Sequence, residues 1–132
     1  MSDPIDPLAW VHRAEEDWLL ARSALRRKVP LTYGATFHAQ QCAEKYLKVL
    51  LVFRRQAFPR THDVIALHDL CMRHGLSVPI GPDRLERLAA YAVQVRSPGK
   101  DPTPDEAQEA VQIAPAVRRW ARALSRPSSR QP

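Results

Sequence analysis

Six side chains with amide, imidazole or charged groups lie in the stretch FHAQQCAEKYLKVLL, residues 37–51. At about 100° per residue along a helix, they occupy most of the side opposite an apolar stripe that runs from Ala39 to Phe53. A row of amides, cations and one carboxylate can contact phosphate groups or the acidic groups of a partner. It can equally be a solvated face in which Glu44 and Lys48 form an ordinary helical ion pair. The six residues are His38, Gln40, Gln41, Glu44, Lys45 and Lys48.

Other residue types that support catalysis or metal binding do not form a recognisable site. His62 and His68 are six residues apart, which on a helix places them on different faces, so we do not expect them to share a metal. Cys42 and Cys71 each lie in an apolar helical pattern and are expected to be buried, reduced thiols. The glycines stand singly and form no phosphate-binding loop. We therefore predict neither a metal site nor a cofactor.

The composition is that of one globular domain: 132 residues, of which 45% are hydrophobic and 26% charged. No apolar run approaches the length of a membrane span. The first residues, MSDPIDPLAW, lack the basic and apolar segments of a secretory signal. We expect a cytoplasmic protein with no membrane partner. The net charge of +6 leaves nucleic acid open as a partner, although the basic residues are dispersed.

The spacing of apolar residues predicts helices and no strands. Thr61 is expected to cap a short third helix and Gly75 to end it, and Thr103 with Glu106 has the spacing of a capping box. We predict an all-α, up-and-down bundle of four main helices plus one short helix over residues 7–124. Residues 1–6 would be an N-terminal extension and residues 125–132 a disordered tail. The expected helices are residues 7 to about 28, about 32 to about 55, 61–75, 85–95 and 104–124.

Four segments in order resemble a known family. They are AEEDWLLAR in the first expected helix, HAQQCAEKYLKVLL in the second, THDVIALHDLC, and YAVQVRSPGKDPTPDEAQEAVQIAPAVRRW. Together they resemble the HEPN domain family of small helical nucleotide-binding and RNase-related proteins. The resemblance covers about residues 7–122, and Arg96-Ser97-Pro98 stands where the family has Arg-Tyr-Pro.

The resemblance implies an all-helical bundle, usually a homodimer, often encoded or fused beside a minimal nucleotidyltransferase. It also implies a relation to toxins of toxin–antitoxin pairs that cleave RNA without a metal, through an Arg-x(4–6)-His motif whose arginine corresponds to Arg96. In that chemistry the arginine binds the scissile phosphate and the histidine is the general acid or base. No histidine follows Arg96, because His74 is the last in the chain. Arg55 and His62 have the required spacing but follow the second helix, so we interpret that match as coincidence.

The leading hypothesis is a non-catalytic HEPN protein that binds a nucleotide or phosphate-bearing ligand, or is the partner subunit of a nucleotidyltransferase. Arg96 would contact the anion and Tyr91 would stack on the ligand or hydrogen-bond to it. Alternatively, Arg96 would pair with the helix dipole or with Asp101. Two other functions stay open, an RNase that uses His62 or His38 as base and a purely structural dimerisation or adaptor module. The opposing wall of the ligand site would be formed by His38, Gln41, Glu44, Lys45 and Lys48.

Overall fold

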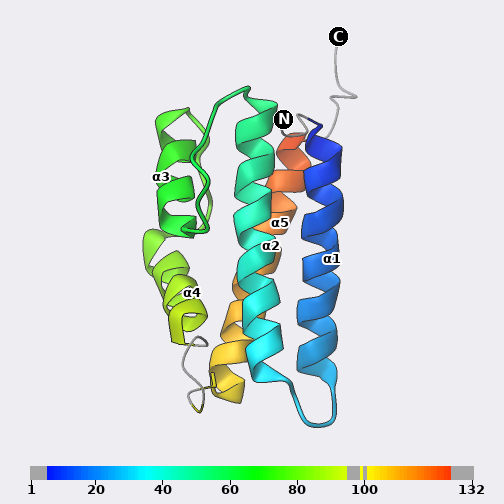
Figure 1. Ribbon diagram of the computed structural model, residues 1–132. Helices are drawn as coiled ribbons and strands as arrows, with labels where there is room; N and C mark the ends of the chain where they lie inside the picture. Colours follow the sequence, from blue (N-terminus) through cyan, green and yellow to red (C-terminus); the bar gives the residue numbers. More distant parts are fainter. Residues whose placement is uncertain (1–5, 95–98, 100, 126–132) are drawn as a thin grey trace.

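The computed structural model describes residues 6–94, 99 and 101–125, and within them the chain forms helices and loops but no strand (Figure 1). This confirms the prediction of an all-α bundle. The short helix is the third, as expected. The helices are α1 (Pro7–Arg26), α2 (Thr32–Phe53), α3 (Val64–Arg73), α4 (Pro82–Gln94) and α5 (Pro104–Ser125).

Helix α2 is the centre of the bundle, because it contacts all four other helices. It forms an antiparallel hairpin with α1, and α5 packs against both, while α3 and α4 lie one after the other along the opposite side of α2 (Figure 1). Side chains such as Tyr46, Leu47 and Leu50 are buried by this arrangement. The candidate site residues of α2 are therefore placed by neighbours on several sides.

The apolar stripes of α1 and α2 extend beyond the buried core at one end of the bundle. Leu8 at the start of α1 is 72% exposed and Phe53 at the end of α2 is 42% exposed, although both belong to stripes that predict burial. The two helices are antiparallel, so both residues lie at the same end of the bundle (Figure 1). Both stripes therefore continue to the end of the bundle, where less of the molecule covers them.

Side-chain caps define where the helices begin. Asp6 Oδ1 accepts a hydrogen bond from the Leu8 amide at 3.0 Å, which starts α1 at the proline that follows. The predicted capping box of α5 is present: Thr103 Oγ1 accepts from the Glu106 amide at 3.1 Å, and Glu106 Oε1 accepts from the Thr103 amide at 2.9 Å.

The predicted start of α3 is wrong by two residues. Asp63 is its N-cap and accepts from the Ile65 amide at 2.9 Å, whereas Thr61 accepts from the amide of Asp63 itself at 3.0 Å. The carboxylate of Asp63 competes for the free amides of the first turn and displaces the start of the helix. At the other end Gly75 has φ +80°, the left-handed conformation that was expected there.

Cys42 and Cys71 are both buried and unpaired. Burial raises the pKa of Cys42 far above its ordinary value and raises the pKa of Cys71 to about 11, so both thiols stay protonated at neutral pH. Over the described residues, none of the helices combines the length and apolar character needed to cross a membrane.

Candidate ligand-binding site

The polar face of α2 divides into a partly exposed half and a buried half. Gln40, Glu44 and Lys48 are only 5%, 1% and 7% exposed, so they do not form a solvated face. His38 and Lys45, in contrast, contact α1 and keep part of their surface open to solvent. The two halves have different partners and are described in turn.

In the exposed half, two nitrogen-bearing side chains of α2 share one carboxylate of α1. His38 Nδ1 lies 2.8 Å from Asp17 Oδ1, and Lys45 Nζ donates to Asp17 Oδ2. The side chain of Asp17 is 9% exposed, whereas those of His38 and Lys45 are 29% and 21% exposed. The carboxylate is thus covered while its two partners still meet solvent.

Aromatic rings continue this surface toward the start of α2. Tyr33 and Phe37 are stacked, with ring centroids 6.1 Å apart and planes inclined by 12°. The ring of Phe37 also meets that of His38 edge to face at 5.1 Å, and Tyr33 is 48% exposed. Gln41, one turn further along, is partly exposed. We call Tyr33, Phe37, His38, Gln41 and Lys45 the α2 surface.

The sequence analysis missed Asp17, Tyr33 and Phe37. A signal for the rings was available, since Tyr33, Phe37 and Gln41 are spaced four apart and so lie on one face of the helix, in line with the polar row. No such signal existed for Asp17, because its contact with His38 depends on how α1 and α2 pack.

In the buried half, a loop covers the carboxylate of Glu44. Glu44 Oε2 lies 3.0 Å from Lys48 Nζ and 2.9 Å from His62 Nδ1, and Gln40 Nε2 donates to the carbonyl oxygen of His62 at 3.1 Å. His62 belongs to the loop between α2 and α3. These contacts fasten that loop to α2, and a ligand role for Glu44 and Lys48 stays a prediction.

Aromatic rings complete the cover over Lys48. Its ammonium group lies 5.5 Å from the ring centroid of Trp10 on α1 and 5.9 Å from that of Phe58 in the loop. The two rings meet edge to face at 6.4 Å. A cation over aromatic faces is stabilised even where little water reaches it. Lys48 is therefore a buried cation that contacts α1, α2 and the loop.

Tyr91 lies in a third network, between α4 and α5. Its hydroxyl donates to Glu109 Oε1, and Arg87 Nε donates to Glu109 Oε2 at 2.8 Å. Burial, followed by the hydrogen bond to Glu109, raises the pKa of Tyr91 to about 12. Within the described residues no hydrogen bond joins Tyr91 to the α2 surface. Arg96 lies outside the described residues, so its predicted contact with a ligand stays a prediction.

A fourth network joins α1, α2 and α5 through Glu15. Arg118 donates to both carboxylate oxygens of Glu15, at 2.6 and 2.8 Å, and the hydroxyl of Tyr46 donates to the same group. Burial alone would raise the pKa of Glu15, but the hydrogen bonds from Arg118 and Tyr46 and the charges of Arg118 and Arg122 outweigh it and lower the pKa. This carboxylate therefore joins the three helices through hydrogen bonds and ion pairs.

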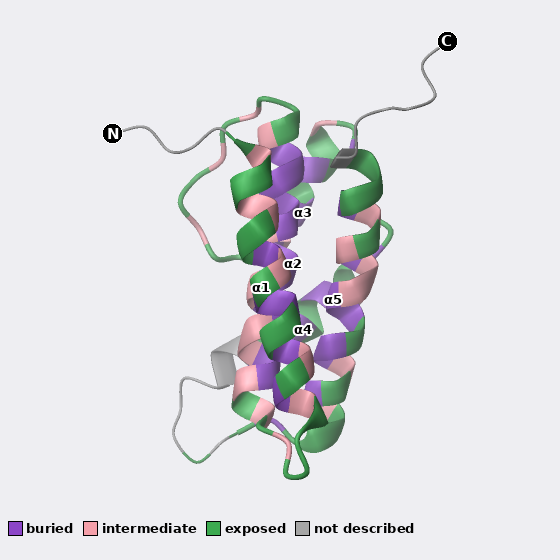
Figure 2. Cartoon of the chain, turned by 90° about the vertical axis from the view of Figure 1, so that its right-hand side faces the viewer, coloured by how far each residue is buried: buried purple, intermediate pink, exposed green. Residues whose placement is uncertain are grey.

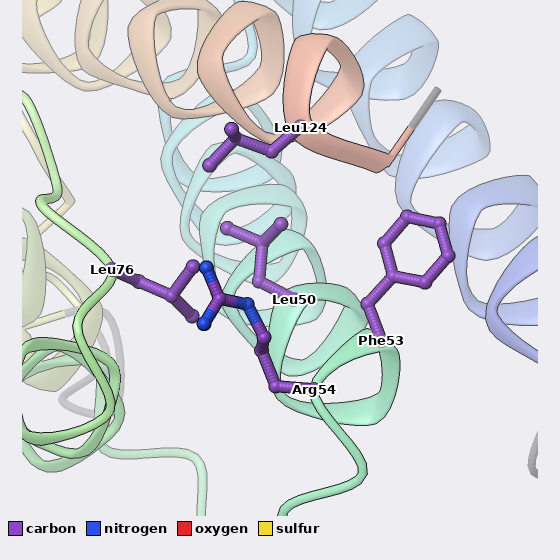
Figure 3. A pocket seen from close by; sticks show the side chains of 5 residues that line it. All are labelled: Leu50, Phe53, Arg54, Leu76 and Leu124. Atoms are coloured by element: carbon purple, nitrogen blue, oxygen red, sulfur yellow. The ribbon is translucent and has the colours of Figure 1, made fainter. Parts of the chain in front are cut away.

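Two hollows of the surface lie away from the α2 surface. One, of about 250 Å³, lies between the end of α2, the segment after α3 and the end of α5 (Figure 3). Arg54 is the charged residue that lines this hollow, and Arg54 Nη1 donates to the carbonyl oxygen of His74 at 3.4 Å. Another, of about 530 Å³, lies on α1. Across the described part of the chain, no three His, Cys, Asp or Glu residues are grouped as metal ligands.

Comparison with known proteins identifies the class of this bundle. The model of the HEPN domain family matches residues 8–124, so the chain belongs to the HEPN domain family. The crystal structure of ST0689, an archaeal HEPN homologue, matches with a TM-score of 0.65 at 24% identity, over 91% of this chain and 98% of that chain. At this identity the match supports the fold. No curated protein matches the sequence.

Proposed function

We propose that this HEPN protein is non-catalytic and binds a nucleotide or another phosphate-bearing ligand on the α2 surface, alone or as the partner subunit of a nucleotidyltransferase. The observation that carries the proposal is the arrangement at Asp17. One covered carboxylate holds an imidazole and an ammonium group that remain partly exposed, beside a pair of stacked aromatic rings.

The two parts of this surface suit the two parts of a nucleotide. A base can stack on the exposed ring of Tyr33 or on Phe37, and such stacking does not depend on the identity of the base. Lys45 and His38 can contact the ionised phosphate by charge-assisted hydrogen bonds. Because Asp17 already fixes both side chains, little conformational entropy is lost when the ligand binds.

Arg96 and Tyr91 remain part of the proposal as additional ligand contacts. Arg96 offers a bidentate guanidinium to a phosphate. The nucleotidyltransferase partnership is supported by membership of the HEPN family. Co-purification of this protein with a nucleotidyltransferase encoded beside it would test that partnership independently of ligand binding.

Calorimetric titration with the common ribonucleoside mono- and triphosphates tests the ligand proposal. A charge-assisted hydrogen bond contributes about 1.5–3 kcal/mol, so His38→Ala should weaken binding by about tenfold or more. His12→Ala is the matched control, since His12 is an exposed histidine of α1 outside the α2 surface. If no nucleotide binds, or if the two variants bind equally, the ligand proposal is wrong.

One observation favours a second function, a metal-independent RNase with His38 as its base. A histidine oriented by a buried carboxylate is a common arrangement for general acid–base catalysis, and His38 has this contact with Asp17. Incubation of the purified protein with total RNA distinguishes the two functions. Cleavage that is present in the wild type and lost in His38→Ala would establish the RNase; its absence would support a binding role.

A further inference from the structure

The outer side of α1 carries a hollow that no part of the ligand proposal uses. It has a volume of about 530 Å³ and is lined by Leu19, Arg22, Ser23, Arg26 and Arg27, which we call the α1 flank. At about 100° per residue, Leu19, Ser23 and Arg26 lie within about 60° of one another on the side of α1 that is opposite Asp17. Figure 2 looks onto the face of the molecule where α1 lies and shows exposed turns along this helix. The α1 flank is therefore separate from the α2 surface.

The α1 flank has an excess of positive charge. Residues 18–43 contain no Asp or Glu, and the cations among them are Arg22, Arg26, Arg27 and Lys28. Arg26, Arg27 and Lys28 are exposed, and in the described part of the chain none of them forms an ion pair. The guanidinium of Arg22 lies over the ring of Trp18, 5.5 Å from its centroid. These charges are available to an acidic partner.

Aliphatic side chains accompany the cations. Leu19 is 59% exposed and Leu20 is 43% exposed, and at the turn after α1 Val29 and Leu31 are 76% and 51% exposed. Exposed apolar residues interleaved with unpaired charges of one sign are typical of a protein interface. Phosphates would neutralise the cations of a nucleic-acid site but would leave these leucines uncovered, and leucine offers no face for base stacking.

We propose that the α1 flank docks an amphipathic helix of a partner protein. Acidic side chains of that helix would face Arg22 and Arg26, and its aliphatic side chains would cover Leu19. The form of the surface supports a helical partner, because Leu19 with Ser23 and Arg22 with Arg26 are each four residues apart, and such rows pack into the grooves of another helix. The interface extends beyond the proposed nucleotide function and does not depend on it.

A labelled acidic peptide tests this interface by fluorescence anisotropy. The probe is a helical peptide of alternating Glu and Leu pairs at a spacing of four, and a peptide of the same composition in scrambled order is its control. The wild-type protein should bind the ordered peptide at least about fivefold more tightly, since only the ordered peptide presents both side-chain types on one face. Equal binding of the two peptides would overturn the proposal.

One charge reversal and one apolar-to-polar substitution then locate the contact. Arg26→Glu should weaken binding by about tenfold, and Leu19→Ser by about threefold to tenfold. The matched control is Arg73→Glu, because Arg73 is also an exposed arginine in the last turn of a helix, α3, and its reversal changes the net charge equally. Equal losses for Arg26→Glu and Arg73→Glu would overturn the proposal. The proposal would also be overturned if a single-stranded RNA or an anionic vesicle bound the wild type more tightly than the peptide does and this binding were lost in Arg26→Glu.

Discussion

Asp17 and His38, from two different helices, share a contact of 2.8 Å between Asp17 Oδ1 and His38 Nδ1. Lys45 occupies the other oxygen of the same carboxylate. One residue of α1 thus fixes an imidazole and an ammonium group of α2 that both stay partly exposed. The α2 surface is held in shape by the packing of the first two helices rather than by a ligand.

Replacing Asp17 should lower the stability of the fold. Asp17→Asn keeps the shape but removes the charge that balances Lys45, and charged hydrogen bonds of this kind contribute about 1.5–3 kcal/mol. Because Lys45 and His38 are partly exposed, we expect a loss of about 1.5 kcal/mol in the free energy of unfolding, measured with urea. Glu16→Gln, at an exposed carboxylate of α1, should change it by less than about 0.5 kcal/mol. Similar losses in both variants would contradict the account.

Glu44 should be more sensitive than Asp17, because its ion pair is buried. Glu44→Gln leaves the ammonium group of Lys48, whose side chain is 8% exposed, without its negative partner. Removing one member of a buried pair costs about 3–5 kcal/mol. We expect the free energy of unfolding, measured with urea, to fall by about 3 kcal/mol in Glu44→Gln.

The double variant Glu44→Leu/Lys48→Met separates the ion pair from packing. An apolar pair of similar volume removes both charges together, so it should recover at least about half of the loss seen in Glu44→Gln. If the double variant is less stable than Glu44→Gln, the contacts of Lys48 with Trp10 and Phe58 stabilise the fold in addition to its ion pair with Glu44.

Stability should fall in acid partly through Glu15. The pKa of Glu15 in the folded state is below its ordinary value near 4.5, so the unfolded chain takes up the proton first as the pH falls. The contribution of Glu15 is therefore complete above about pH 4.5 and is lost as the pH falls through the folded-state pKa. Between about pH 6 and about pH 3, the wild type should lose more unfolding free energy than Glu15→Gln. Equal losses would mean that Glu15 is not clamped by Arg118. Glu109, whose pKa is lowered first by the hydrogen bond from Tyr91, should leave a residual pH dependence in the variant.

The helices and their ends were largely predictable because their signals are local. A capping box such as Thr103 with Glu106, or a glycine such as Gly75 after a helix, acts through backbone groups a few residues away. The error at α3 has the same origin, since Thr61 and Asp63 are both good caps and only the carboxylate of Asp63 bonds the first turn.

The burial of half the polar face could not be predicted from the sequence. The residues that cover Glu44 and Lys48 are His62 and Phe58 in the loop after α2 and Trp10 on α1. Their contacts depend on the path of that loop and on helix packing, and no periodic pattern encodes either. The same applies to Glu15 and Arg118, which are 103 residues apart. From the sequence alone, charged residues at helical spacing that form buried pairs therefore cannot be distinguished from those that stay partly exposed.

Arg96 and Tyr91 should differ in their effects on ligand binding. If Arg96 binds a phosphate, Arg96→Ala should weaken nucleotide affinity by about tenfold without a matching loss for inosine, which has no phosphate. Tyr91→Phe should lower stability by about 1 kcal/mol, because its hydroxyl bonds Glu109. Calorimetric titration and urea unfolding of both variants measure these effects. Unchanged nucleotide affinity in Arg96→Ala would remove Arg96 from the site.

Amide NMR spectra recorded during titration with the common ribonucleoside monophosphates test the central claim most directly. The account predicts that the largest shifts occur at Tyr33, Phe37, His38, Gln41 and Lys45, and that they are weaker with the matching nucleosides, which lack the phosphate. His38→Ala should reduce the shifts at all of these positions. Shifts that are absent, or that centre on the hollow at Leu50 and Arg54, would contradict a nucleotide site on the α2 surface.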